Sequence, residues 1–255
     1  MSYLGIIDWG IGGLGLYQHL KRAGDIPTLY FSDAGHTPYG KTTPELLQKR
    51  LWSIISFLQE KGATHIAIAC NAANAAFEDR DNITGIINHG ITAVLRTRKQ
   101  KIGLLAGRGT VCSGVFERKT IGLPIQLVQQ IAQPLSAHIE AGRLEGPELN
   151  SDLEEIMHTV RSCEVLLLAC THYPAITEQI TKYTNPQCTI IDPAIEMADW
   201  ILDNWSFNRN NQTDQWFTTG VVDDMISTGK MAFQVEISDV THIPTNALRK
   251  FLEHK

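Results

Sequence analysis

Two cysteines stand at matching places in two similar stretches of this 255-residue chain. Cys70 closes the run IAIAC at residues 66–70, and Cys170 closes the run LLLAC at residues 166–170. Each follows an apolar, strand-like run and precedes a small polar residue, where nearby backbone N–H groups favour a thiolate that is exposed as a base or nucleophile. A single free cysteine is commonly just a small core residue. A symmetric pair instead favours a shared catalytic role.

Three further polar residues could set the proton affinity of these thiols. Asp8 ends the first apolar run, His172 follows Cys170 by two positions, and Glu140 closes the segment AHIE. A carboxylate or an imidazole beside a thiol tunes its pKa and stabilises a developing negative charge. Taken singly, each of the three also fits an ordinary surface or capping residue. Together with the cysteines they form the candidate acid–base set.

A glycine-rich turn with Gly10, Gly12 and Gly13 follows the first apolar run and opens a helical pattern. Glycines there let the backbone approach an anion, and a helix N-terminus favours negative charge. The spacing is not G-x-G-x-x-G and no P-loop is present, so carboxylate binding fits better than nucleotide binding, with a plain tight turn as the alternative. No His/Cys group has metal-ligand spacing and no lysine stands in a pyridoxal-phosphate context, so we expect neither a metal nor a cofactor.

Short apolar runs alternate with longer helical patterns along the chain. The pattern predicts buried strands at residues 4–8, 28–32, 65–69, 101–106, 164–169 and 189–192. It predicts helices at residues 14–23, 44–61, 149–162 and 194–205, with Gly62 as the C-cap of the second. Such alternation indicates an α/β fold of largely parallel sheets flanked by helices.

The two halves of the chain also repeat each other. The strand-like segment at residues 4–8 recurs 98 positions later, and the cysteine run recurs 100 positions later. We therefore expect two pseudosymmetric α/β domains, with residues 1–96 plus 208–255 in the first, residues 97–207 in the second, and the polar run 208–214 as the crossing. Ligands of open α/β sheets bind beyond the carboxyl ends of the strands, which places the active site in the interdomain cleft.

The composition limits the partners. A net charge of −5 gives no basic excess for binding nucleic acid. No apolar stretch approaches the roughly 20 residues of a membrane helix, and the N-terminal run meets Asp8 too early for a signal peptide. The five cysteines are odd in number and contain no C-x-x-C pair, which favours reduced thiols in a cytoplasmic protein. We expect a small-molecule substrate, no nucleic-acid or membrane partner, and a homodimer as one possible assembly.

Five motifs resemble the aspartate/glutamate racemase family over nearly the whole chain. They are DWGIGGL at residues 8–14, PYG at 38–40, CNAAN at 70–74, GT with SG at 109–114, and CTHYP at 170–174. The last motif is the family's second cysteine motif unchanged, and PYG precedes the first cysteine as it does in the family. The chain is therefore identified as similar to glutamate racemase and its relatives.

The resemblance implies two-base racemisation of an acidic amino acid without a cofactor. One cysteine, as thiolate, would remove the α-hydrogen while the other, as thiol, protonates the opposite face. Asp8, Glu140 and His172 would correspond to the family's auxiliary acid–base groups. The positions implied to contact substrate are Trp9, Gly12, Gly13, Pro38, Tyr39, Gly40, Asn71, Ala72, Arg108, Thr110 and Thr171.

The substrate expectation depends on three departures from the family pattern. Trp9 stands in place of a Ser, while Ala72 and Gly107 each stand in place of a Thr. A bulky Trp9 would shorten the pocket, and Arg108 offers a cation with long reach, so we expect aspartate, as in the aspartate racemases found beside nonribosomal peptide assembly lines. Glutamate racemisation for peptidoglycan is the first alternative. An inactive homologue that binds or senses an amino acid is the second.

Overall fold

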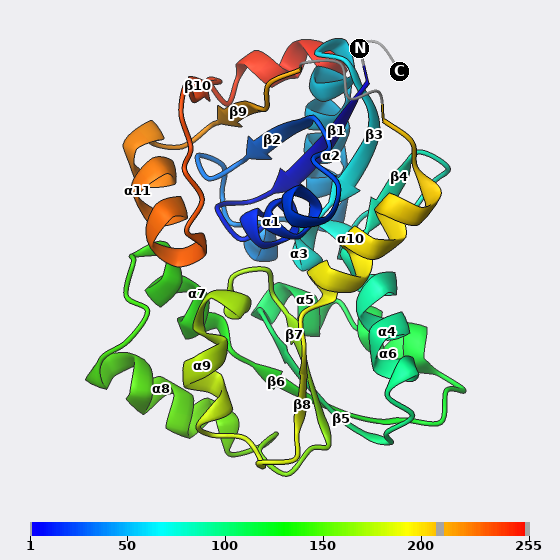
Figure 1. The fold of residues 1–255 in the computed structure, drawn as a ribbon, viewed down its shortest axis with the longest axis vertical. Coiled ribbons are helices and arrows are strands. Elements are labelled where there is room, and N and C mark those ends of the chain that lie inside the picture. Colours follow the sequence, from blue (N-terminus) through cyan, green and yellow to red (C-terminus); the bar gives the residue numbers. More distant parts are fainter. Residues whose placement is uncertain (1, 208–211, 253–255) are drawn as a thin grey trace.

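Two parallel β-sheets form the framework of the molecule, a computed structural model that describes residues 2–207 and 212–252 (Figure 1). The larger sheet has six strands in the order β10-β9-β2-β1-β3-β4, and the smaller has four in the order β6-β5-β7-β8. Every strand pair within the two sheets is parallel. The carboxyl ends of all strands in one sheet therefore lie at the same edge, where ligands of such sheets bind.

The strands come from separate parts of the chain. The larger sheet contains β1 (Tyr3–Asp8), β2 (Thr28–Ser32), β3 (Ala63–Ile68), β4 (Ile83–Gly85), β9 (Gln215–Thr218) and β10 (Thr241–His242). The smaller sheet contains β5 (Lys101–Ala106), β6 (Gln126–Ile131), β7 (Val165–Ala169) and β8 (Thr189–Ile191). The C-terminal strands thus join the sheet that the N-terminal strands build, whereas the predicted domain boundaries stay predictions. Residues 208–211 of the predicted crossing lie outside the described residues.

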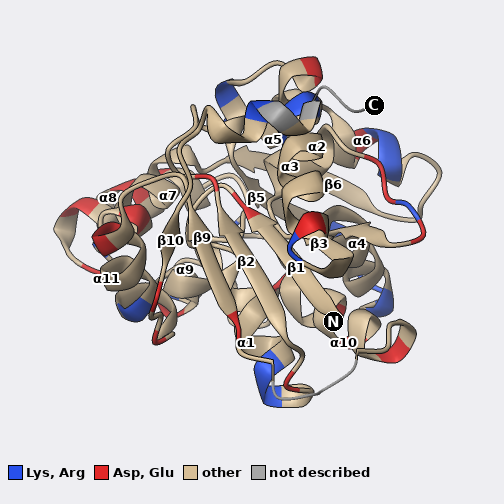
Figure 2. Cartoon of the chain, turned by 90° about the horizontal axis from the view of Figure 1, so that it is seen from above, with Lys and Arg blue, Asp and Glu red and all other residues tan. Residues whose placement is uncertain are grey.

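Helices cover both sheets. They are α1 (Leu14–Ala23), α2 (Pro44–Glu60), α3 (Asn71–Ala75), α4 (Ile86–Arg96), α5 (Arg108–Cys112), α6 (Val115–Thr120), α7 (Gln133–Glu140), α8 (Pro147–Met157), α9 (Thr177–Thr181), α10 (Pro193–Asn204) and α11 (Val222–Phe233), with 3-10 turns η1 (Tyr39–Lys41), η2 (Tyr173–Ile176) and η3 (Ala247–Leu252). None of those in the described part of the chain is long and apolar enough to cross a membrane. Lys and Arg alternate with Asp and Glu around the periphery in Figure 2.

The α/β fold predicted from the sequence is confirmed, and the differences in its elements have local causes. The helix predicted at residues 149–162 instead spans Pro147–Met157, because Pro147 at its first position presets the helical φ and the N–H of Val160 turns back to the carbonyl of Met157. The pattern missed β6, whose sequence QLVQQI is largely polar at the sheet edge. Gly62 follows α2 with a φ of +103°, the left-handed region that favours glycine.

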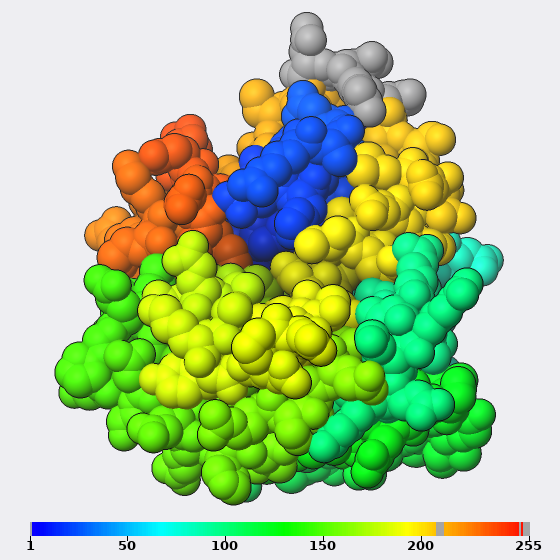
Figure 3. Space-filling view, turned by 60° about the horizontal axis from the view of Figure 1, so that its bottom comes forward, coloured from blue at the N-terminus to red at the C-terminus, as the bar shows by residue number. Residues whose placement is uncertain are grey.

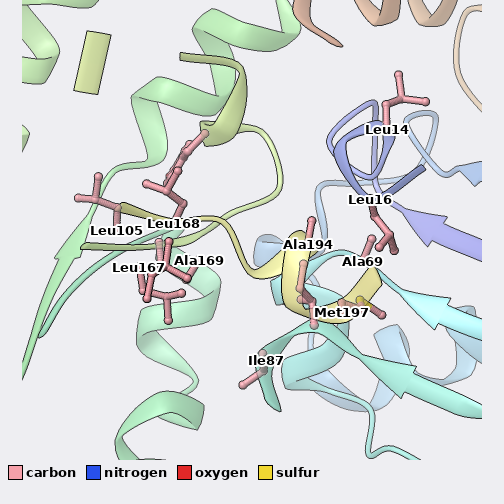
Figure 4. Close-up of a cluster of buried hydrophobic side chains, with 14 of the residues drawn as sticks. Leu14, Leu16, Ala69, Ile87, Leu105, Leu167, Leu168, Ala169, Ala194 and Met197 are labelled. Atoms are coloured by element: carbon pink, nitrogen blue, oxygen red, sulfur yellow. The ribbon is translucent and has the colours of Figure 1, made fainter. Parts of the chain in front are cut away.

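The main hydrophobic core runs through both sheets. One cluster joins Leu14 and Leu16 of α1 to Leu167 and Leu168 of β7. Figure 4 shows that α10 lies between these two groups and directs Met197 into the cluster. In Figure 3 the yellow segment that contains α10 lies against both the blue and the green parts of the surface. The strand ends of the two sheets are therefore held in fixed positions by continuous apolar packing.

Candidate active site

Cys70 lies just beyond the carboxyl end of β3, in extended backbone that leads into α3. Its side chain is half-buried. Burial, and after it the negative charge of Asp8, raises the pKa of the Cys70 thiol, and the charge of Cys170 acts in the same direction. Hydrogen bonds from the N–H groups of Ala73 and Ala72 lower that pKa in part. The two thiols thus lie close enough to influence each other, and Cys70 holds its proton firmly.

Cys170 follows β7 of the other sheet and has a different neighbour. Its Sγ lies 3.7 Å from Nδ1 of His172, whose Nε2 pairs directly with Oε1 of Glu140. The same Oε1 accepts a hydrogen bond of 3.3 Å from the N–H of Ile11, in the glycine-rich turn after β1. Burial lowers the pKa of His172, but the Glu140 carboxylate and Cys170 together outweigh burial and raise that pKa well above the ordinary value. In return, the histidine lowers the pKa of Glu140 despite its burial.

Asp8, at the end of β1, connects the larger sheet to Thr171, which follows β7 of the smaller sheet. The carboxylate is fully buried at the end of β1, accepting hydrogen bonds from Gly10 N–H at 3.1 Å and from the Thr171 hydroxyl at 2.9 Å. Burial raises the pKa of Asp8, although the positive charge of His172 opposes that rise. The carboxyl group can therefore hold a proton more readily than a solvated aspartate, which suits an auxiliary acid–base group.

The glycine-rich turn lies where no side chain would fit. A Cβ atom added to Gly10 would meet Oε1 of Glu140 at 2.1 Å, and one added to Gly12 would meet Oγ1 of Thr171 at 2.3 Å. These glycines let the turn pack directly against residues of the smaller sheet. Two of the N–H groups of the turn bind carboxylates of the protein itself, those of Asp8 and Glu140. Binding of a substrate carboxylate by this turn stays a prediction.

Asn71 is a buried residue of the site whose side-chain amide has no partner within the described protein. It is 2% exposed, yet neither its amide nitrogen nor its amide oxygen has a hydrogen-bond partner. Buried polar groups are nearly always paired, so an orphan amide beside Cys70 indicates a partner that is added on binding. Thr110, also predicted to contact substrate, is 2% exposed and lies two residues beyond Arg108 at the start of α5.

Three of the other predicted contact residues, Trp9, Tyr39 and Gly40, lie in the turn after β1 and in η1. The indole N–H of Trp9 donates to the carbonyl of His36 at 3.0 Å, and the buried Tyr39 donates its hydroxyl to Asp33 at 2.8 Å. Gly40 touches Gly109 of the other sheet, because a Cβ on Gly109 would lie 2.4 Å from Cα of Gly40. The hydroxyl of Tyr39 is thus engaged within the protein, and what the residue offers a ligand is its backbone.

The remaining predicted positions are more open. Arg108 is exposed at the first position of α5, and its backbone N–H donates to Gln133 at 3.1 Å. Within the described residues its guanidinium has no hydrogen bond or ion pair. Pro38 and Ala72 are half-buried, and Gly13 packs against Tyr30 and Asp8. Among the residues that the structure describes, no group of three or more metal-binding side chains is arranged to hold a metal ion.

Sequence reasoning did not identify Asp33 or the bridge between Thr171 and Asp8. Asp33 directly follows β2, and its carboxylate is fully buried. Its position after a predicted strand was a usable signal, because polar residues at strand ends gather at one sheet edge. The bridge between Thr171 and Asp8 joins residues 163 positions apart and leaves no such local signal.

A family model described as Asp/Glu/Hydantoin racemase matches residues 16–199, more than half of the chain. The chain belongs to this family. A glutamate racemase of Oceanobacillus iheyensis is 28% identical over 253 residues and 91% of each chain. One of Pseudomonas entomophila is 31% identical over 208 residues, 76% of this chain and 78% of that one. Family membership makes the chain an amino-acid racemase, as its motifs predicted.

Solved structures of this family share the fold. A glutamate racemase of Francisella tularensis, in complex with D-glutamate, superposes with a TM-score of 0.85 at 23% identity, over 96% of this chain and 98% of that chain. An aspartate racemase of Picrophilus torridus reaches a TM-score of 0.63 at 18% identity, over 79% and 93%. Two sheets that face each other through their strand ends are thus the architecture of the family.

The pair formed by His172 and Glu140 predicts a pH dependence of stability. The raised pKa of His172 adds stability that is fully present below about pH 6.5, its unfolded value, and is lost as pH rises through the folded pKa. The lowered pKa of Glu140 adds stability that is present above the ordinary glutamate value of about 4.5 and is lost as pH falls. We therefore compare the free energy of unfolding of wild type with that of His172→Asn in urea titrations. The amount by which wild type exceeds the variant should shrink above pH 6.5, by up to about 1.4 kcal/mol per pH unit.

His89 provides a control of opposite sign. It is buried on α4, and burial lowers its pKa to about 4. Because the folded protein then disfavours the charged form, the excess stability of wild type over His89→Asn should increase as pH rises from 4 to about 6.5. Equal slopes for the two variants would contradict the assignment of an ionised pair at His172.

Proposed function

We propose that the chain interconverts the enantiomers of glutamate without a cofactor, with Cys70 and Cys170 as the two bases. The observation that carries this proposal is the placement of the two thiols beyond corresponding strands, β3 and β7, of two facing sheets. An orphan amide of Asn71 adjoins the first thiol, and an imidazole adjoins the second. The names of the relatives support glutamate as the substrate.

The proposed reaction moves one proton in and one proton out. The Cys170 thiolate takes the α-hydrogen of L-glutamate, and the electron pair of the broken C–H bond remains on the substrate as a carbanion. The Cys70 thiol then donates its proton to the opposite face, which yields D-glutamate and a Cys70 thiolate. In the reverse direction, the two cysteines exchange these tasks. By the family's pattern, Cys70 serves the D-enantiomer and Cys170 serves the L-enantiomer.

The surroundings of the thiols support this division of protonation states. Burial and Asp8 keep Cys70 in the thiol form, since both raise its pKa. His172, held protonated by Glu140, places an N–H 3.7 Å from the sulfur of Cys170. The carbanion between the two thiols needs preorganised donors in a site closed to water, and Asn71 is suited to supply one.

Aspartate is the second candidate substrate, and the exposed side chain of Arg108 favours it. Arg108 has no side-chain partner among the residues described, and its long stem could reach a distal carboxylate with a bidentate fork. Since one methylene is worth only about 1–3 kcal/mol of discrimination, both diacids deserve measurement.

The test is a racemisation assay over L-aspartate, L-glutamate and neutral amino acids in deuterated water, followed by chiral chromatography and mass spectrometry. We expect the highest kcat/KM for L-glutamate and one deuterium in every inverted product. If aspartate is turned over instead, Arg108→Ala should raise its KM about tenfold or more, while Lys41→Ala provides the control for charge alone. Binding of an amino acid with neither inversion nor α-hydrogen exchange would contradict the proposal and favour an inactive binding protein.

A further inference from the structure

Asp33 carries a fully buried carboxylate that lies outside the acid–base set. Asp33 accepts four side-chain hydrogen bonds: from Tyr39 Oη at 2.8 Å, from Arg50 Nε at 2.9 Å and Nη2 at 2.6 Å, and from Thr219 Oγ1 at 2.8 Å. Its exposed fraction is 0%. An isolated buried carboxylate is costly, but here both oxygens are saturated by a bidentate guanidinium and two hydroxyls. The group is therefore a fixed point in the larger sheet.

This fixed point gathers segments that are far apart in the sequence. Arg50 lies on α2, and its Nη1 donates to the carbonyl of Thr245 near the C-terminus at 2.9 Å. Thr219 follows β9. The backbone N–H of Asp33 donates to the carbonyl of Asp8 at 3.0 Å, which ties the network to the acid–base set through the main chain.

Tyr39 joins the Asp33 network to the turn η1. Tyr39 is 3% exposed, and the turn η1 that contains it packs against α3, the helix that directly follows Cys70. The next residue, Gly40, is the one that touches Gly109 across the two sheets. A single side-chain hydrogen bond thus separates the buried Asp33 from the turn whose backbone contacts Gly109 of α5.

We propose that the ion pair of Asp33 and Arg50 is a positioning element that holds the Tyr39–Gly40 turn against Gly109, so that the site is closed when substrate is bound. This inference rests on the proposed function. The apparent affinity for a ligand falls in proportion to the fraction of protein in the binding-competent state. Loosening the turn therefore raises KM and admits small reagents to Cys70, while the proton-transfer groups themselves are intact.

Tyr39→Phe is the sharpest test because it deletes only the hydroxyl that bonds Asp33, and Thr219→Val is its matched control. Both remove one hydroxyl donor from the same carboxylate at a similar depth, since the two residues are 3% and 6% exposed, and Thr219→Val also removes the acceptor of the Gly35 N–H, which makes it the more severe test of lost stability. We expect Tyr39→Phe to raise KM about tenfold with kcat changed less than threefold, and Thr219→Val to leave both within twofold. Arg50→Lys, which keeps the charge but loses the fork, should raise KM as Tyr39→Phe does.

The second readout does not require racemase activity. The rate of iodoacetamide alkylation at Cys70, measured by peptide mass spectrometry against the exposed Cys112, should rise about tenfold in Tyr39→Phe and remain unchanged in Thr219→Val. An unaltered KM and an unaltered Cys70 alkylation rate in Tyr39→Phe would overturn the inference. So would equal effects of the two variants, since these would follow from lost stability alone. A wild-type protein without racemase activity would refute the proposed function, and the alkylation rates would still decide the role of the turn.

Discussion

Replacing either Cys70 or Cys170 alone by serine is expected to lower the rate of racemisation by about 10²–10⁴-fold, the usual contribution of a positioned acid or base. A hydroxyl is a far weaker base than a thiolate at neutral pH. Each face of the substrate has its own thiol, so the remaining cysteine cannot replace the lost one. Because the two enantiomers have equal free energy in water, kcat/KM must fall equally in both directions, whichever cysteine is changed. The measurement is the initial rate of inversion from each pure enantiomer.

Isotope exchange separates the two cysteines. In Cys70→Ser, Cys170 can still remove the α-hydrogen of the L-enantiomer and return a solvent deuteron to the same face. We therefore expect L-substrate to gain deuterium without inversion in this variant, and D-substrate to do so in Cys170→Ser. Cys112→Ser is the control, because Cys112 is exposed on α5. Undiminished inversion in Cys70→Ser would refute the two-base mechanism.

Asp8→Asn is expected to lower kcat by about 10²-fold or more, the second largest effect. The substitution keeps the shape of the side chain and removes the charge that lies beside Cys70. The variant deletes the carboxylate that is proposed to act as an auxiliary proton acceptor, since an amide cannot be protonated at this pH. The bonds with Gly10 and Thr171 limit how far the new side chain can move.

The same variant should change thiol reactivity in the opposite direction. The charge of Asp8 raises the pKa of Cys70, so the neutral amide should ease formation of the thiolate and speed alkylation of Cys70. Thr171→Val, which removes one hydrogen bond to Asp8 and leaves the charge, is the matched comparison. It should not speed alkylation. Slower alkylation of Cys70 in Asp8→Asn would contradict the expected effect of the Asp8 charge on that thiol.

The pattern of the sequence was sufficient for β1, β2, β3, β5, β7 and β8 and for the cysteines that follow two of them, but it did not predict β9 and β10. Apolar runs at residues 28–32 and 101–106 coincide with β2 and β5, because hydrophobic periodicity directly reports burial within a sheet. Cys70 and Cys170 were identifiable because each follows such a run. The edge strand β6 and the short strand β4 were not predicted, since neither carries enough apolar residues to form a hydrophobic pattern.

The sequence by itself determined the α/β class, the repeat of the two halves, and the residue types available for proton transfer, since these depend on local periodicity and on motifs that resemble the family. Only the tertiary structure decided which groups meet. It joined Thr171 to Asp8, Glu140 to His172, and the turn at Gly40 to Gly109. It also directed the Tyr39 hydroxyl to Asp33 and left Asn71 unpaired. Such pairings depend on how two sheets pack through α10 and on the space between them, which no local pattern of residues encodes.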